Sequence, residues 1–343
     1  MMLITVARND HLMGHLPPFA NGLSNVRVAR VARSLDAVAL NEWQRHLQAE
    51  MPEDQVLTTL EPEQNAEISV AVVANPTPGS LYPLPSLRLI QSLWAGVDRL
   101  VADTTLPPGV PVCRMVDPQM NVAMAETGQW AVLALHRGFF GYARQQAKAQ
   151  WQPLAQRRAD ELRVLVLGWG QMGRTLGLRL NAMGYRVAAW RSRAAATAQP
   201  QQVDGVEMHI GTEALGAALG QADILVNLLP LTPSTRGLLN ASCFAALPRG
   251  ASVVNLARGA HLVEADLLAA LDAGQLSHAV LDVFNTEPLP ASHPFWQHPA
   301  ITVLPHAAAQ TDPRSAAAVV AANVRALKAG EPLMHQVDFT LGY

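Results

Sequence analysis

The sequence predicts an α/β protein built on doubly wound parallel sheets. Its 343 residues favour two domains over one. From Leu162 onward, short apolar stretches alternate with turns and with helical stretches such as ADLLAALDAG, the pattern of a parallel sheet covered by helices on both faces. A similar alternation in the first third predicts a second, smaller α/β unit. The predicted strands of the larger unit read RVLVLG, YRVAAW, DILVNLL, ASVVNLA, HAVLDVF and AITVLP.

The smaller unit is predicted from three apolar stretches. EISVAVVANP indicates a buried strand that ends at a turn, LRLIQSLWAGVDRL indicates a short strand and a glycine turn, and PVCRMV indicates a third strand. Either LITV or VRVARVA is the first strand of the chain, and LNEWQRHLQAEM, which follows both, has a helical pattern.

Two helices and one loop complete the expected layout. One long helix is predicted over DPQMNVAMAETGQWAVLALHRGFFGYARQQAKAQW, with Asp117 as its N-cap and Pro118 at its first position. A second helix is predicted over DPRSAAAVVAANVRALKAGEP, with Gly330 near its end. AAATAQPQQVDG is expected to be a low-complexity loop.

Composition excludes several classes of function. The net charge of −2 gives no electrostatic footprint for a nucleic-acid partner. Two stretches without charge, 68–87 and 288–311, contain too many prolines for a membrane helix. Cys113 and Cys243 fit no metal or redox spacing. We therefore expect buried free thiols, no metal site and a cytoplasmic protein.

A glycine-rich turn predicts dinucleotide binding. Gly168, Gly170 and Gly173 form G-x-G-x-x-G, with Gln171 and Met172 between the last two, directly after a strand and at the start of a helix. Glycine at these positions permits a tight turn and lets the backbone approach a pyrophosphate at the helix N-terminus. A tight structural turn and a methyl-donor site are the alternatives. The bulky Trp169 must point away from the phosphates.

The end of the next strand predicts which dinucleotide binds. An NAD site usually places an acid about 20 residues after the glycines, where it accepts from the ribose hydroxyl. This chain has Arg191, Ser192 and Arg193 there. Arginine pairs with a phosphate, so these residues predict a 2′-phosphate and hence NADPH, with NADH as a possible second cofactor. The alternative is a pair of solvated arginines.

Polar residues at three later strand ends predict the chemistry. Arg258, Asp282 with Glu287, and His306 each lie at or just after the C-terminal end of a predicted strand, the edge where open α/β sheets bind ligands. Taken singly, each also suits an ion pair or a surface loop. Together, Arg258 suits a substrate carboxylate, His306 suits a proton donor, and Glu287 suits a carboxylate that keeps the imidazole protonated. We therefore expect a 2-oxo acid substrate.

Several motifs resemble the D-isomer-specific 2-hydroxyacid dehydrogenase family. They are GWGQMG, NLLPLTPSTRGLLN, VVNLARGAHLVEADLLAALDAG, LDVFNTEPLP and HPFWQHPAITVLPHAA. SLWAGVD and the tail QVDFTLGY are most similar to its glyoxylate/hydroxypyruvate reductase A branch. The resemblance covers roughly residues 70–343 and departs from the family where Arg191 to Arg193 replace its usual acid.

The resemblance implies roles for individual residues. Arg258, Glu287 and His306 would be the catalytic trio. The backbone at Ala95 and Gly96 would hold the substrate carboxylate, and Trp94 would lie near the pocket unless it is a core tryptophan. The residues implied on the cofactor side are Leu229, Pro230, Ala257 and Asp282 near the nicotinamide, and Thr235 nearer the phosphates.

The resemblance also implies a layout and a reaction. Residues 1–117 and 312–343 would form a Rossmann-like substrate domain into which a cofactor domain, 118–311, is inserted; a homodimer would form through DPQMNVAMAETGQW. The expected reaction is NADPH-dependent reduction of glyoxylate to glycolate and of hydroxypyruvate to D-glycerate, with His306 as general acid. The alternatives are a family member for larger 2-ketoacids or phosphoglycerate, and a nicotinamide-sensing binding protein.

Overall fold

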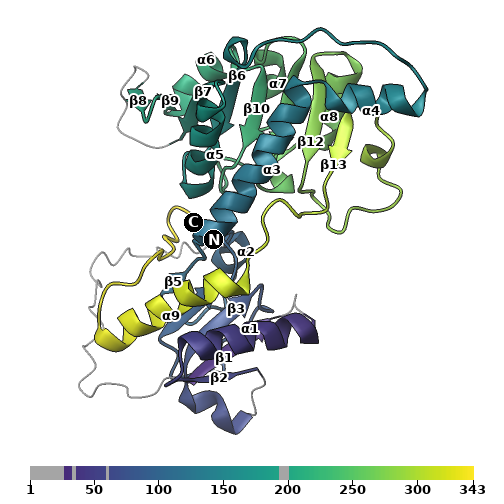
Figure 1. Cartoon of the computed structure of the whole chain (residues 1–343). Coiled ribbons are helices and arrows are strands. Elements are labelled where there is room, and N and C mark those ends of the chain that lie inside the picture. The colour runs from purple at the N-terminus through teal and green to yellow at the C-terminus, as the bar shows by residue number, and fades with distance from the viewer. Residues whose placement is uncertain (1–26, 33–35, 59–61, 193–200) are drawn as a thin grey trace, which may run out of the picture.

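The computed structural model has two sheet-containing units joined by α3 and the segment before α9 (Figure 1). It describes residues 27–32, 36–58, 62–192 and 201–343. Both sheets are parallel except for one strand of the larger sheet, which confirms the predicted fold class.

The smaller unit has a five-stranded parallel sheet in the order β2-β1-β3-β4-β5. α1 and α9 pack side by side on one face, where they enclose an apolar core, and α2 lies on the other face. The first strand comes from VRVARVA, whereas LITV lies outside the described residues. The bounds are β1 Arg27–Ala32, α1 Ala37–Glu50, β2 Gln55–Leu57, β3 Ile68–Ala74, β4 Leu89–Ser92, α2 Asp98–Val101, β5 Val112–Cys113 and α9 Pro313–Ala329.

The larger unit has an eight-stranded sheet in the order β13-β12-β11-β10-β6-β7-β9-β8. Its central strands are apolar on both faces because α3 and α5 cover one face while α6, α7 and α8 cover the other. The strands are β6 Arg163–Leu167, β7 Arg186–Arg191, β8 Gln201–Val203, β9 Val206–Ile210, β10 Ile224–Asn227, β11 Ala251–Asn255, β12 Leu276–Leu281 and β13 Ile301–Val303. The helices are α3 Pro118–His136, α4 Phe139–Ala147, α5 Gln171–Ala182, α6 Leu215–Leu219, α7 Ala241–Ala246 and α8 Glu264–Asp272.

Two sequence predictions in this unit are wrong. The predicted long helix is two helices, α3 and α4, because Gly138 adopts a left-handed conformation with φ 69° between them. The last part of the predicted loop is strand β8, which pairs antiparallel with β9. Asp204 and Gly205 connect the two strands, both with positive φ, as a two-residue hairpin turn requires.

The two connections between the units are fixed to each other. Asp117 is 1% exposed and caps α3 by accepting from the Gln119 N–H at 3.1 Å. Its other oxygen accepts from the Ser315 hydroxyl at 2.8 Å, in the first turn of α9. Just before α9, Thr311 donates to the Leu93 carbonyl at 3.0 Å. The polar contacts at the two crossings therefore bring the C-terminal end of β4 toward the larger unit.

Candidate active site

Arg258, Glu287 and His306 follow three adjacent strands of the larger sheet. Arg258 lies after β11, Glu287 after β12 and His306 after β13, and these strands are neighbours in the order β13-β12-β11. Because the strands are parallel, their C-terminal ends lie along one edge. The charge of Arg258 influences the pKa of both other residues, so the three groups share one electrostatic environment.

His306 and Glu287 form a hydrogen-bonded pair. Nδ1 of His306 is 2.8 Å from Oε2 of Glu287, and Oε1 of Glu287 accepts from the Phe284 N–H at 2.9 Å. The His306 N–H donates to the Asp282 carbonyl at 2.9 Å, and the residue has a positive φ of 52°. Half of the His306 side chain is exposed, and none of the described residues hydrogen-bonds to its Nε2. Nε2 is thus free to face a substrate.

This pairing favours the protonated form of the histidine. The hydrogen bond to Glu287 raises the pKa of His306 above its ordinary value, against the partial burial that lowers it. Partial burial raises the pKa of Glu287, but its hydrogen bonds to His306 and the Phe284 N–H outweigh burial and leave that pKa below its ordinary value. The pair therefore favours an imidazolium beside a carboxylate.

Asp282 fixes the backbone that follows the histidine. It is 1% exposed, and its two oxygens accept from the N–H groups of Ala307 at 2.7 Å and Ala308 at 3.1 Å. Burial raises the pKa of Asp282, whereas these two N–H groups lower it, and the net pKa is raised. Its contact with a nicotinamide remains a prediction.

Arg258 is held by the smaller unit. Its Nε donates to Oδ1 of Asp98 at 3.0 Å, and its Nη1 donates to the Ala257 carbonyl at 2.7 Å. A Cβ on Gly96 would lie 1.3 Å from Nη2, so only glycine leaves room for the guanidinium at that position. The structure thus places Gly96 against Arg258, while their contact with a substrate remains a prediction. It also shows Asp98 beside Arg258, which the sequence prediction missed.

Two buried asparagines hold the loops that follow β10 and β11. Asn227 donates from Nδ2 to Oδ1 of Asn255 at 3.0 Å and accepts from the Leu229 N–H at 3.2 Å. Asn255 in turn accepts from the Ala257 N–H at 3.3 Å and donates to the Arg258 carbonyl at 3.0 Å. Sequence reasoning missed both, although the repeated V-N-L at two strand ends was a readable signal.

The other residues predicted on the cofactor side lie in the loops after β10 and β11. Thr235 is 4% exposed, and its hydroxyl donates to the Pro230 carbonyl at 2.7 Å. The ring of the fully buried His261 lies 3.2 Å from the same carbonyl. Leu229 and Ala257 are also buried.

The glycine turn has the geometry expected for a pyrophosphate. Gly168 has φ 97°, and a Cβ on Gly173 would lie 1.9 Å from the Gly168 carbonyl oxygen, so both positions require glycine. A Cβ on Gly170 would meet nothing within 4 Å, which leaves open space at the N-terminus of α5, and no side chain caps that helix. These residues therefore fit a dinucleotide phosphate.

The neighbours of the glycine turn are placed as follows. Trp169 packs over Gly177 on α5, as the sequence requires, away from the start of the helix. Gln171 begins α5, and Met172 packs against the cores of both units. Arg191 ends β7 and, like Ser192, is exposed, whereas Arg193 lies outside the described residues.

The predicted substrate loop after β4, which contains Trp94, Ala95 and Gly96, is held by hydrogen bonds of its backbone. The Trp94 N–H donates to the Ser92 hydroxyl at 3.0 Å, and the Trp94 carbonyl accepts from the Met115 N–H at 3.1 Å. Trp94 and Ala95 are partly buried against the core of the smaller unit. Trp94 therefore has a packing role whether or not it lines a pocket.

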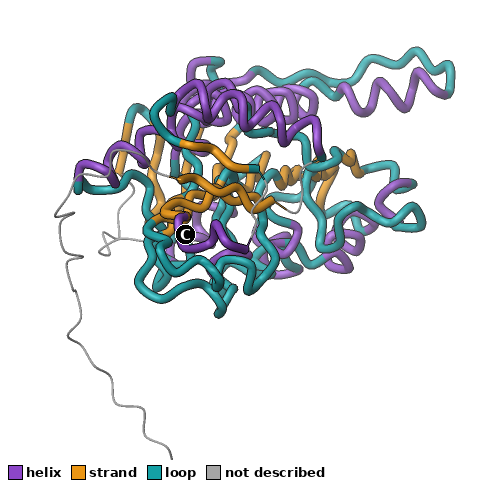
Figure 2. The backbone as a smooth tube through the Cα atoms, turned by 90° about the horizontal axis from the view of Figure 1, so that it is seen from below, coloured by secondary structure: helices purple, strands orange, loops and turns teal. Residues whose placement is uncertain are grey.

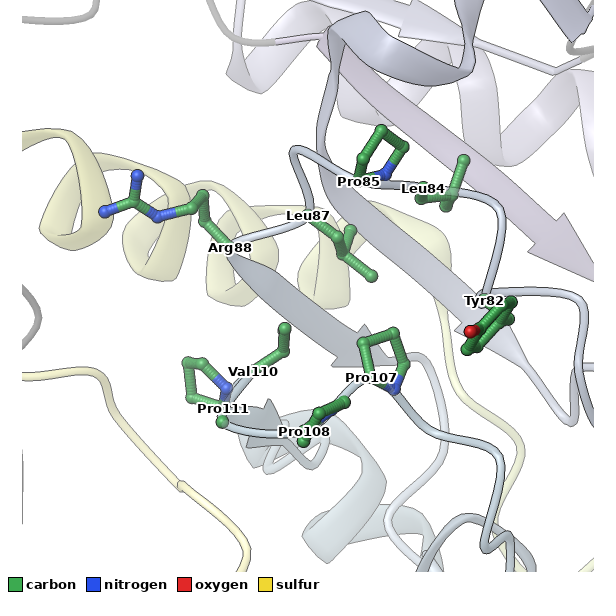
Figure 3. A pocket seen from close by; sticks show the side chains of 10 residues that line it. Tyr82, Leu84, Pro85, Leu87, Arg88, Pro107, Pro108, Val110 and Pro111 are labelled. Carbon is green, nitrogen blue, oxygen red and sulfur yellow. The ribbon is translucent and has the colours of Figure 1, made fainter. Parts of the chain in front are cut away.

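Figure 3 shows a cavity of about 380 Å³ on the smaller unit, lined by Tyr82, Arg88 and several prolines. It lies at the N-terminal ends of β4 and β5, whereas the predicted substrate loop follows the C-terminal end of β4. It is thus separate from the candidate site.

In the described part of the chain, no cluster of three His, Cys, Asp or Glu side chains has the placement of a metal site. None of the described helices has the length and apolarity needed to span a bilayer.

Comparison with known proteins identifies the family. Residues 129–308 match the model of the D-isomer specific 2-hydroxyacid dehydrogenase NAD binding domain. The glyoxylate/hydroxypyruvate reductase A of Serratia proteamaculans is 41% identical over 307 residues, covering 88% of this chain and 96% of that protein. The chain therefore belongs to the D-isomer specific 2-hydroxyacid dehydrogenase family of oxidoreductases, which confirms the resemblance seen in the sequence.

Solved structures of similar proteins support the same family assignment. A D-isomer specific 2-hydroxyacid dehydrogenase from Xanthobacter autotrophicus Py2, in complex with NADPH and MES, has a TM-score of 0.86 and 39% identity, covering 94% of this chain and 100% of its own. An NADPH-dependent glyoxylate/hydroxypyruvate reductase from Sinorhizobium meliloti, in complex with NADP and sulfate, has a TM-score of 0.84 and 33% identity, covering 93% of this chain and 100% of its own.

Proposed function

We propose that this chain catalyses the NADPH-dependent reduction of glyoxylate to glycolate and of hydroxypyruvate to D-glycerate. The observation that carries the proposal is the 2.8 Å contact between His306 and Glu287 in the same electrostatic environment as Arg258. This arrangement supplies a proton donor and a carboxylate anchor, the two groups that a 2-oxo acid needs. The names of the Serratia and Sinorhizobium relatives support the same substrates.

Each residue of the trio has a separate task in the proposed mechanism. Arg258 binds the substrate carboxylate, together with backbone N–H groups at Ala95 and Gly96. This orients the 2-oxo group toward Nε2 of His306, which donates its proton to the carbonyl oxygen as the hydroxyl forms. Glu287 keeps His306 charged before the transfer and holds the ring through Nδ1. A bound nicotinamide supplies the hydride.

The glycine turn and the end of β7 would hold the cofactor. Gly170 and the first turn of α5 would face the pyrophosphate, while Arg191, Ser192 and Arg193 would pair with a 2′-phosphate. NADH would be used less well because it lacks the 2′-phosphate that these arginines would bind. Three of the structural relatives contain NADPH or NADP, which supports this preference.

We further propose that residues 118–311 bind the cofactor and that residues 1–117 with 312–343 bind the substrate. A homodimer would form through α3 and the segment after α4, which extends away from the larger unit and carries the almost fully exposed Trp151 (Figure 2). Trp130 on α3 is also exposed. The free, buried Cys113 and Cys243 suit a reducing cytoplasm.

The test is cofactor oxidation, followed by nicotinamide absorbance, with glyoxylate or hydroxypyruvate and either NADPH or NADH. Fast loss of NADPH and slow loss of NADH support the proposal. Turnover only with larger 2-ketoacids or with the phosphoglycerate couple would assign the chain to another activity of the family. Binding of NADPH without turnover of any ketoacid would indicate a nicotinamide-sensing protein.

A further inference from the structure

The substrate-anchoring arginine belongs to one unit and its acidic partner belongs to the other. Arg258 follows β11, and Asp98 begins α2, directly after the loop that contains Ala95 and Gly96. Nε of Arg258 lies 3.0 Å from Oδ1 of Asp98, and the two side chains are only 30% and 26% exposed. The contact is thus a partly buried, charge-assisted hydrogen bond between the units.

The guanidinium is confined on three sides. Nε donates to Asp98, Nη1 donates to the Ala257 carbonyl, and Nη2 lies directly against Gly96. An arginine side chain has several rotatable bonds and five N–H groups, so without such contacts its planar end would sample many orientations. Two of these three contacts come from the proposed substrate loop and its end, namely from Gly96 and Asp98.

The contact also selects the edge that remains for a ligand. A carboxylate pairs with arginine either through Nε and one terminal nitrogen or through the two terminal nitrogens. Nε donates to Asp98, and Nη1 donates one of its two N–H groups to the Ala257 carbonyl. The N–H groups left for a ligand are therefore the second one on Nη1 and the two on Nη2, which lies against Gly96. An arginine stays charged at any ordinary pH, so Asp98 is not needed to keep it protonated. Its effect on the site must come through orientation or through its own charge.

We infer that Asp98 is a positioning residue that turns the terminal nitrogens of Arg258 toward the carboxylate of a 2-oxo acid. This inference rests on the proposed role of Arg258 as the substrate anchor. Two effects of Asp98 oppose each other, because its hydrogen bond orients the arginine while its negative charge repels an anionic substrate. If the orienting hydrogen bond has the larger effect on substrate binding, loss of Asp98 raises the KM. If the repulsion has the larger effect, loss of Asp98 lowers the KM.

Two variants separate these effects. Asp98→Ala removes both the oxygen and the charge, whereas Asp98→Asn keeps a carbonyl oxygen that accepts from Nε. We expect Asp98→Ala to raise the KM for glyoxylate about 10–100-fold, the range of a charge-assisted hydrogen bond, with a smaller change in kcat. We expect Asp98→Asn to stay within about threefold of the unaltered chain, because its oxygen preserves most of the orientation.

The measurements are KM and kcat for glyoxylate with NADPH, the Kd of NADPH, and the Kd of oxamate for the NADPH complex by titration calorimetry. Oxamate is a non-reacting 2-oxo acid analogue, so it reports on the anchor without turnover. The Kd of NADPH should not change. Asp103→Ala is the matched control, because that partly buried carboxylate lies just after α2 and accepts from the Thr105 N–H rather than from Arg258.

The possible results are distinct. An unchanged or lower KM in Asp98→Ala, or equal losses in the alanine and asparagine variants, would overturn the inference while leaving the proposed reaction intact. Absent ketoacid turnover with oxamate binding that depends on Asp98 would overturn the proposed function but support the inference. An unaltered chain that neither turns over a ketoacid nor binds oxamate would overturn both.

Discussion

Substituting Gly96 with alanine should damage catalysis while leaving the fold intact. A Cβ at this position would lie 1.3 Å from Nη2 of Arg258 and 2.5 Å from its Cζ. Ordinary contacts between such atoms are about 3.5 Å, so the guanidinium would have to retreat by about 2 Å. The obstructing atoms are the far end of a flexible side chain, and Gly96 is not among the positive-φ glycines, so the backbone accepts alanine.

The size of the loss follows from the displacement. A 1 Å error in placing a substrate or a catalytic group costs about 10² in rate, so we expect kcat/KM for glyoxylate to fall by at least about 10². The thermal midpoint should change little, because the substitution creates neither a cavity nor a strained backbone.

The assay compares kcat/KM, the Kd of NADPH and the melting temperature of Gly96→Ala with those of Gly216→Ala. Gly216 lies in α6, where an added Cβ would meet nothing within 4 Å, so that variant should behave like the unaltered chain. A Gly96→Ala protein that keeps kcat/KM within a few fold would refute the placement of Arg258 against this loop.

Three further predictions concern the trio and the cofactor site. His306→Gln removes the proton donor and should lower kcat about 10²–10⁴-fold with the Kd of NADPH unchanged; steady-state turnover near the unaltered value would remove His306 from its role. Arg191→Ala should reduce the NADPH-over-NADH ratio of kcat/KM about tenfold, since one charge-assisted contact is lost, and an unchanged ratio would make Arg191 a solvated cation. Gly173→Ala places a Cβ 1.9 Å from the Gly168 carbonyl oxygen, so chemical denaturation should show a loss of about 1–3 kcal/mol in the free energy of unfolding, and equal stability would contradict the turn geometry.

The sequence predicted the strands that carry the site because they are apolar throughout and end at turn residues. β6, β10, β11 and β12 all coincide with predicted stretches, and the polar residues after β11 to β13 do share one edge. β8 was missed because its residues, Gln201–Val203, are mostly polar. The hairpin signal was the Asp-Gly pair that follows them.

Tertiary contacts explain the other omissions. Asp98 and Arg258 lie 160 residues apart, and nothing in the local pattern of either shows that they meet. Gly96 was assigned to the substrate through its backbone, yet the contact that demands glycine is with an arginine of the other unit. Gly138 was predicted to lie within one long helix because single glycines occur in helices. Only its left-handed backbone conformation shows that the helix ends there.

In the proposed mechanism, Glu287 keeps His306 protonated for proton donation. The most direct test is the pH dependence of kcat for glyoxylate reduction in the unaltered chain and in Glu287→Gln. Because the carboxylate raises the pKa of His306, activity should persist above the ordinary histidine value of about 6.5 and fall once pH passes the raised pKa. In Glu287→Gln the fall should move to lower pH. A flat profile through the alkaline range, or the same midpoint in both proteins, would contradict the claim.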